Sequence, residues 1–129
     1  MSRLRTLLHD PGLRPRWRAL LALLLVVISW LAFTPQPPTP GFDGADKINH
    51  LMAFAALAVV AGLASAPGRF VAWRIGAGLL GYGGFIESVQ TLLPPRQGEW
   101  ADLLADAAGI AAGLAVLALL RRRGHAGLH

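Results

Sequence analysis

The sequence of 129 residues contains no cysteine and few charged side chains. Without cysteine, the chain can form no disulfide, no thiolate nucleophile and no thiolate metal site. Charged residues make up 15% of the chain, against about 25% in ordinary globular domains. Hydrophobic residues make up 54%, and the mean hydropathy is +0.50. These values indicate a membrane protein, and the length predicts a single membrane domain, residues 1–129.

The sequence also lacks a basic surface interleaved with aromatic residues, which is the usual pattern of nucleic-acid binding. The formal net charge is +5, but the arginines gather beside apolar segments. Positive residues that flank apolar segments are typical of membrane proteins. We therefore expect membrane lipids as partners and no nucleic-acid partner.

Four apolar segments predict an all-α fold, a four-helix transmembrane bundle. We expect spans at about 17–33, 48–66, 71–90 and 101–120. Prolines interrupt the chain between them, because proline disfavours helix at its own position and at the preceding residue. A short basic amphipathic helix, Arg3 to His9, is expected on the membrane surface before the first span.

The first apolar segment, residues 19–33, has two interpretations. It is shorter than the ~20 residues expected of a span. Trp17 and Arg18 can extend it by aromatic anchoring and by snorkelling. A cleaved signal peptide shares its basic start and leucine-rich core, but a clear A-x-A cleavage site is missing. We favour a retained helix.

Four spans would place both termini on the same side of the membrane. Every arginine except Arg96 would then lie on that side, and Lys47 would lie with Arg96 on the other. Because short cytoplasmic loops carry an excess of arginine and lysine, we expect both termini in the cytoplasm.

Two polar clusters adjoin the apolar segments. Asp46, Lys47 and His50 begin the second span, on or near one helical face. The second cluster surrounds the break between the third and fourth spans. Carboxylates next to apolar segments are costly, so they need partners or a function. With four spans, both clusters lie at the non-cytoplasmic face. The second cluster consists of Glu87, Gln90, Arg96, Glu99, Asp102 and Asp106.

Small residues recur at helical spacing in the third and fourth spans. In membranes, such residues let helices pack closely. Gly109 and Gly113 form a G-x-x-x-G pattern, which can pack within one chain or between two. The stripe in the third span consists of Ala77, Gly81, Gly84 and Ser88.

The two polar clusters together resemble the VanZ-like family, over residues 46–113. The resemblance implies a small multi-pass protein of the bacterial inner membrane. One member of that family is linked to resistance against the glycopeptide antibiotic teicoplanin. Asp106 departs from the pattern, where the residue is more usually asparagine. The matching pieces are Asp46-Lys47-x-x-His50, an apolar helix with Phe54, Ile86-Glu87-x-x-Gln90 and Arg96-x5-Asp102-x3-Asp106-x-x-Gly109.

We expect the polar site to recognise an anionic lipid headgroup, a lipid-linked cell-wall precursor or a glycopeptide-related ligand at the periplasmic face. Lys47 and Arg96 would hold its phosphate. The other expected ligand-binding residues are Asp46, Gln90 and Asp106.

Two alternatives remain open. In the first, the protein is an enzyme that hydrolyses or transfers a phosphate, pyrophosphate or glycan headgroup. His50 would be its acid/base group, oriented by Asp46 or by a carboxylate of another helix, and Glu87 and Asp102 would assist. In the second, the ion pairs fasten the helix ends and perform no chemistry.

We expect no cofactor and assign no metal ligands, although carboxylates suit a divalent cation such as Mg²⁺ or Ca²⁺. A cluster with one histidine and no cysteine disfavours zinc. Proton transport is disfavoured too, because no carboxylate lies near the middle of a span. The oligomeric state is not fixed by the sequence.

Overall fold

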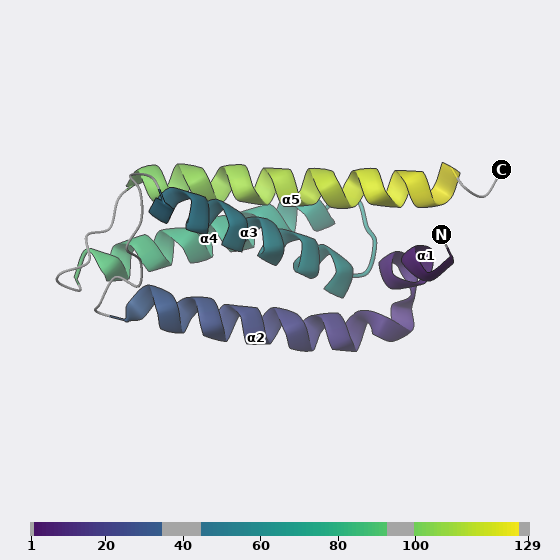
Figure 1. The fold of residues 1–129 in the computed structure, drawn as a ribbon, viewed down its shortest axis with the longest axis horizontal. Coiled ribbons are helices and arrows are strands. Elements are labelled where there is room, and N and C mark those ends of the chain that lie inside the picture. The colour runs from purple at the N-terminus through teal and green to yellow at the C-terminus, as the bar shows by residue number, and fades with distance from the viewer. Residues whose placement is uncertain (1, 35–44, 93–99, 127–129) are drawn as a thin grey trace.

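A computed structural model describes residues 2–34, 45–92 and 100–126, and every regular element in these ranges is a helix. The all-α prediction is thereby confirmed. Figure 1 shows the helices in chain order. They are α1 (Ser2–His9), the short 3-10 helix η1 (Pro11–Leu13), α2 (Arg14–Phe33), α3 (Ala45–Ala64), α4 (Val71–Gln90) and α5 (Trp100–Ala126).

Local sequence explains where the helices begin and end. The basic helix predicted before the first span is α1, and the Asp10 side chain after it accepts a 2.9 Å hydrogen bond from the Gly12 N–H. Proline in the first turn then starts α2, because its missing N–H has no helical partner there in any case. The bounds of α4 equal the predicted ones. Helix α5 is longer than predicted, since it continues through Arg121 to Arg123.

Three helices among the described residues are long and apolar enough to cross a membrane. They cover Pro11–Phe33, Lys47–Ala64 and Trp100–Arg123. Helix α4 is not among them, because its five glycines, Arg74 and Glu87 lower its average hydropathy. Its length of 20 residues equals that of α3.

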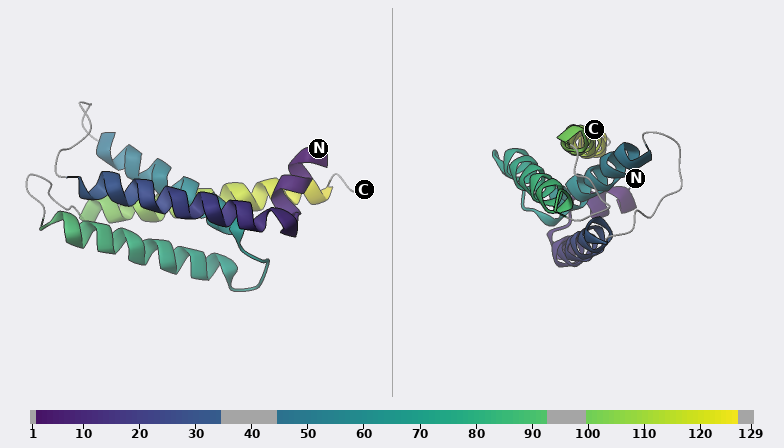
Figure 2. Two further views of the ribbon diagram at one scale, coloured as in Figure 1. Left: turned by 90° about the horizontal axis from the view of Figure 1, so that it is seen from below. Right: turned by 90° about the vertical axis from the view of Figure 1, so that its left-hand side faces the viewer.

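The four long helices run along the long axis of the molecule (Figure 1). Helix α3 packs against α2, α4 and α5, and the end-on view in Figure 2 shows it between them. Helix α1 lies at the same end as the last turns of α5. The last turns of α2 and α4 and the first turns of α3 and α5 lie at the other end. The core between the long helices contains Phe54, Leu57, Ala58, Leu79, Ile86 and Ile110.

Helices α3 and α5 approach each other closely at two glycines. A Cβ atom on Gly109 would collide with the carbonyl oxygen of Leu51. A Cβ atom on Gly113 would collide with the carbonyl oxygen of Ala55. The G-x-x-x-G pattern therefore serves packing within one chain, which was one of the two uses the sequence left open.

The small-residue stripe of α4 behaves differently. Gly81 and Gly84 have no atom of the described residues within 4 Å of the place a Cβ would take. Ala77 and Ser88 are exposed. The expectation that this stripe packs against a neighbouring helix is therefore wrong for the described chain. The reason is that α4 turns its other face inward, with Leu79, Gly83, Ile86, Glu87 and Gln90 buried.

Candidate functional site

The site is centred on His50, in the second turn of α3. Its Nδ1 atom lies 2.8 Å from Oδ1 of Asp106 in α5. An ionised carboxylate can only accept, so opposite an ionised Asp106 the Nδ1 atom carries the hydrogen and donates it. Asp106 is fully buried, with 0% of its surface exposed. This hydrogen bond fixes the ring orientation and leaves Nε2 facing other groups.

Two further carboxylates lie next to the His50 ring. Oε1 of Glu87 in α4 is 3.9 Å from Nδ1, and Oδ2 of Asp102 in α5 is 3.7 Å from Nε2. Both acidic residues are buried. The first turns of α3 and α5 and the last turn of α4 thus bring together His50, Glu87, Asp102 and Asp106. Sequence reasoning placed all four in one region.

Lys47 lies at the outer edge of this cluster. Its Nζ atom is 3.6 Å from Oδ1 of Asp102, and its side chain is 45% exposed, against 13% for His50. Lys47 precedes His50 by nearly one helical turn, so both side chains extend over the same side of α3. The two basic side chains are therefore nearer to solvent than the carboxylates next to them.

Gln90 has a different environment from the one expected. It is buried, and its Nε2 donates a 3.0 Å hydrogen bond to the carbonyl oxygen of Ala32. That carbonyl belongs to the last turn of α2, where the helix has no further N–H to donate to it. Gln90 therefore ties α4 to α2, and this geometry favours a structural role over the predicted ligand contact.

The second oxygen of Asp106 packs against the backbone of α4. A Cβ atom on Gly83 would stand 2.6 Å from Oδ2, so only glycine leaves room there. Oδ2 is buried and accepts no hydrogen bond from the described residues. A buried carboxylate oxygen without a donor lowers the stability of the folded chain.

Some predicted residues lie outside the part of the chain that the structure describes. Arg96 and Glu99 fall between α4 and α5. Asp46 belongs to α3, but its side chain is not described. The roles predicted for Asp46 and Arg96 stay predictions.

The arrangement has two chemical capacities. His50 can exchange a proton at Nε2, with Asp106 holding its other nitrogen. His50, Glu87 and Asp102 can also hold a metal ion, because one ligand atom from each lies within 4.8 Å of the others. Two atoms 3.7 Å apart, such as His50 Nε2 and Asp102 Oδ2, can both lie about 2.1 Å from one ion.

Two contacts could not be anticipated from the sequence. The partner of Gln90 is a backbone carbonyl, which leaves no trace in the residue pattern. Asp106 orients His50 across 56 positions of sequence. Its spacing of four residues from Asp102 signalled a shared helical face, but nothing indicated which of the two would bind the imidazole.

Comparisons of the chain with models of protein families, with curated proteins and with solved structures found no match. The VanZ-like resemblance therefore stays a prediction. The function must be argued from the geometry of the site.

Proposed function

We propose that this chain is a VanZ-like protein of the bacterial inner membrane that recognises the phosphate of an anionic lipid headgroup or of a lipid-linked cell-wall precursor. The observation that carries this proposal is the cluster of His50, Glu87, Asp102 and Asp106 at one end of the helices. Buried ionisable groups next to apolar helices mark functional sites in membrane proteins.

The proposed topology has four spans, with α4 as the third and with both termini in the cytoplasm. Helix α4 packs against α3 and α5, and one of the polar groups that lower its hydropathy, Glu87, lies on its inward face. The arginines of α1, of the first turn of α2 and of the last turns of α5 lie at the opposite end from His50. This distribution supports a cytoplasmic arginine-rich end and a periplasmic site.

The cations of the site are the groups that would bind phosphate. Lys47 is exposed enough to reach a ligand while Asp102 holds it in place. His50, one turn further along α3, has Asp106 behind it and can add a second donor. The buried carboxylates then position the cations, and the cations contact the headgroup.

Catalysis is the second candidate, and the hydrogen bond between His50 and Asp106 favours it. A histidine held at Nδ1 by a buried carboxylate presents Nε2 in a fixed direction. That geometry suits an acid/base group in hydrolysis or transfer at a phosphate. Glu87 and Asp102 lie close enough to the ring to position a water molecule or a leaving group.

Lys47→Gln is expected to weaken binding of a short polyprenyl pyrophosphate by about tenfold or more, because a charge-assisted contact is lost. Binding would be titrated by microcalorimetry on protein in neutral detergent, with the thermal unfolding midpoint recorded for each variant. The matched control is Arg74→Gln, which removes an exposed positive charge near the start of α4. Arg74→Gln should bind like the wild type.

Three other results would each change the assignment. Unaltered affinity in Lys47→Gln together with a lower unfolding midpoint would overturn recognition and favour the structural clamp. Equal weakening in both variants would show that general positive charge attracts the probe. Release of phosphate by the wild type, lost in His50→Gln, would establish the enzyme.

A further inference from the structure

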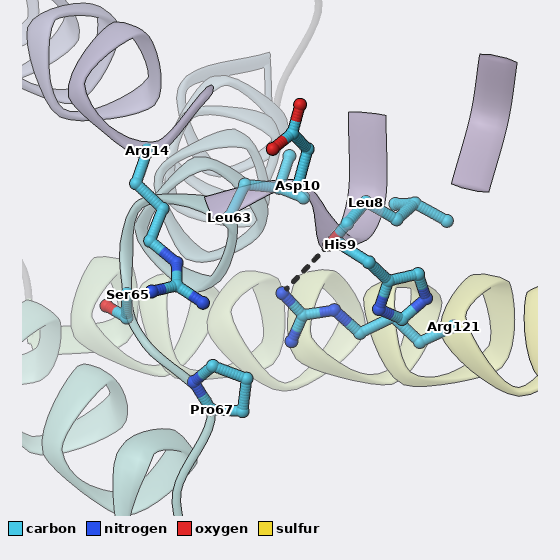
Figure 3. A pocket seen from close by; sticks show the side chains of 8 residues that line it. All are labelled: Leu8, His9, Asp10, Arg14, Leu63, Ser65, Pro67 and Arg121. Carbon is cyan, nitrogen blue, oxygen red and sulfur yellow. Dashed lines mark hydrogen bonds between the residues drawn. The ribbon is translucent and has the colours of Figure 1, made fainter. Parts of the chain in front are cut away.

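A cavity of about 170 Å³ lies at the end of the molecule opposite to His50. It forms where α1 lies across the ends of α3 and α5 (Figure 3). Leu8 of α1 is buried with Leu63 of α3 and Leu117 of α5, and this packing holds α1 in place. The cavity thus has an apolar wall, supplied by Leu8, Leu63 and Pro67, and a polar wall.

Two guanidinium groups lie in the polar wall, together with His9, Asp10 and Ser65. Arg14 begins α2 and Arg121 lies in the last turns of α5, and Figure 3 shows their head groups turned toward each other. The two charges repel each other. Among the described residues, no carboxylate makes an ion pair with either of them. The Asp10 carboxylate also lines the cavity, and one of its oxygens accepts the N–H of Gly12. It sets one negative charge against the two guanidinium groups, so the lining keeps an excess of positive charge.

The other contacts of Arg121 are to neutral groups. One terminal nitrogen lies 3.5 Å from the carbonyl oxygen of Leu8 and 3.2 Å from that of Gly62. Its Nε atom is buried and donates to no acceptor in the described residues. These carbonyls position the guanidinium without neutralising it. Two positive charges that share a partly buried cavity call for an anion between them.

We propose that this cavity binds a phosphate group, and specifically the headgroup phosphate of an acidic phospholipid. Its volume equals that of about six water molecules at ~30 Å³ each, which is enough for a tetrahedral oxyanion. Arg14 and Arg121 offer planar forks of N–H donors that match the oxygens of a phosphate. The apolar wall gives the glycerol and upper acyl carbons a surface to contact.

The position of the cavity favours a lipid over free phosphate. Arg122 and Arg123 follow Arg121 on α5 and are exposed, where an apolar helix gives way to positive charge. Such a change occurs at the depth of the lipid headgroups, and anionic lipids gather near clustered arginines. This inference concerns a site remote from His50 and does not depend on the function proposed there.

The test is Arg14→Gln, with Arg16→Gln as the matched control. Both arginines lie in the first turn of α2 and lose one charge, but Arg16 is exposed and does not line the cavity. The probes are short-chain phosphatidylglycerol and, separately, inorganic phosphate, each titrated into protein in neutral detergent. We expect Arg14→Gln to bind the lipid about tenfold more weakly than wild type. Arg16→Gln should stay within about twofold of wild type.

Each outcome decides the proposal. Similar losses in both variants would overturn it, because diffuse surface charge would then explain the binding. Failure of the wild type to bind either probe would overturn it as well. If wild type binds inorganic phosphate as tightly as lipid, the anion site stands and the lipid assignment fails. Arg121→Lys, which keeps the charge but loses the planar fork, should weaken lipid binding in a protein with an unchanged unfolding midpoint.

Discussion

Asp106→Ala is expected to lower the free energy of unfolding by about 1–3 kcal/mol, the usual cost of leaving a buried hydrogen-bond donor without its acceptor. Asp106 is fully buried, and the substitution removes the acceptor that holds His50 at 2.8 Å. The imidazole would then lie next to Glu87 and Asp102 without its shortest contact. Unfolding in detergent, followed by the fluorescence of the four tryptophans, measures the difference.

The matched control is Asp106→Asn, which keeps an oxygen that can accept the His50 Nδ1–H. We expect it to lose less than half as much stability as the alanine variant. If alanine and asparagine cost the same and both cost less than about 0.5 kcal/mol, Asp106 does not hold His50.

Gly109→Ala is expected to destabilise the protein by about 1–3 kcal/mol or more, as overpacking does. A Cβ atom at this position would meet the Leu51 carbonyl and stand 3.1 Å from the Ala55 nitrogen. Backbone atoms cannot move aside as a flexible side chain can, so α3 and α5 must separate. The same unfolding assay and the yield of folded protein report the effect.

Gly81→Ala provides the control within the same chain. Gly81 is also a helical glycine, but open space surrounds it among the described residues. Because alanine forms helix more readily than glycine, Gly81→Ala should stabilise the protein slightly, by up to about 1 kcal/mol. Equal destabilisation by both substitutions would contradict the close α3–α5 contact.

The helices were readable from the sequence because long apolar segments and prolines act locally. Helix α4 has the predicted bounds, and α3 and α5 begin within three residues of the predicted spans. The sequence did not predict in the same way which face of each helix packs against its neighbours. Gly109 and Gly81 look alike in sequence, yet one touches a backbone and the other faces outward. Which face of a helix turns inward depends on all its neighbours at once.

The site was partly predictable for a similar reason. Helical spacing placed His50, Glu87, Asp102 and Asp106 at one end, and the structure brings them together. The individual partners followed from side-chain geometry that spacing does not encode. The cavity at the other end was not predicted from the sequence, because Arg14 and Arg121 come from opposite ends of the chain.

The length of α5 has a consequence for how the protein would sit in a bilayer. Its 27 residues extend about 40 Å, whereas the hydrocarbon layer of a membrane is about 30 Å thick. Tilting absorbs an excess of apolar length, but the excess of α5 is its charged end from Arg121 onward. Here, tilting α5 would drag Arg121 and the α1 helix packed on Leu117 toward the acyl chains. In a bilayer, the charged last turns of α5 and the α1 helix packed on them would therefore limit how far this end of the molecule can enter the hydrocarbon layer.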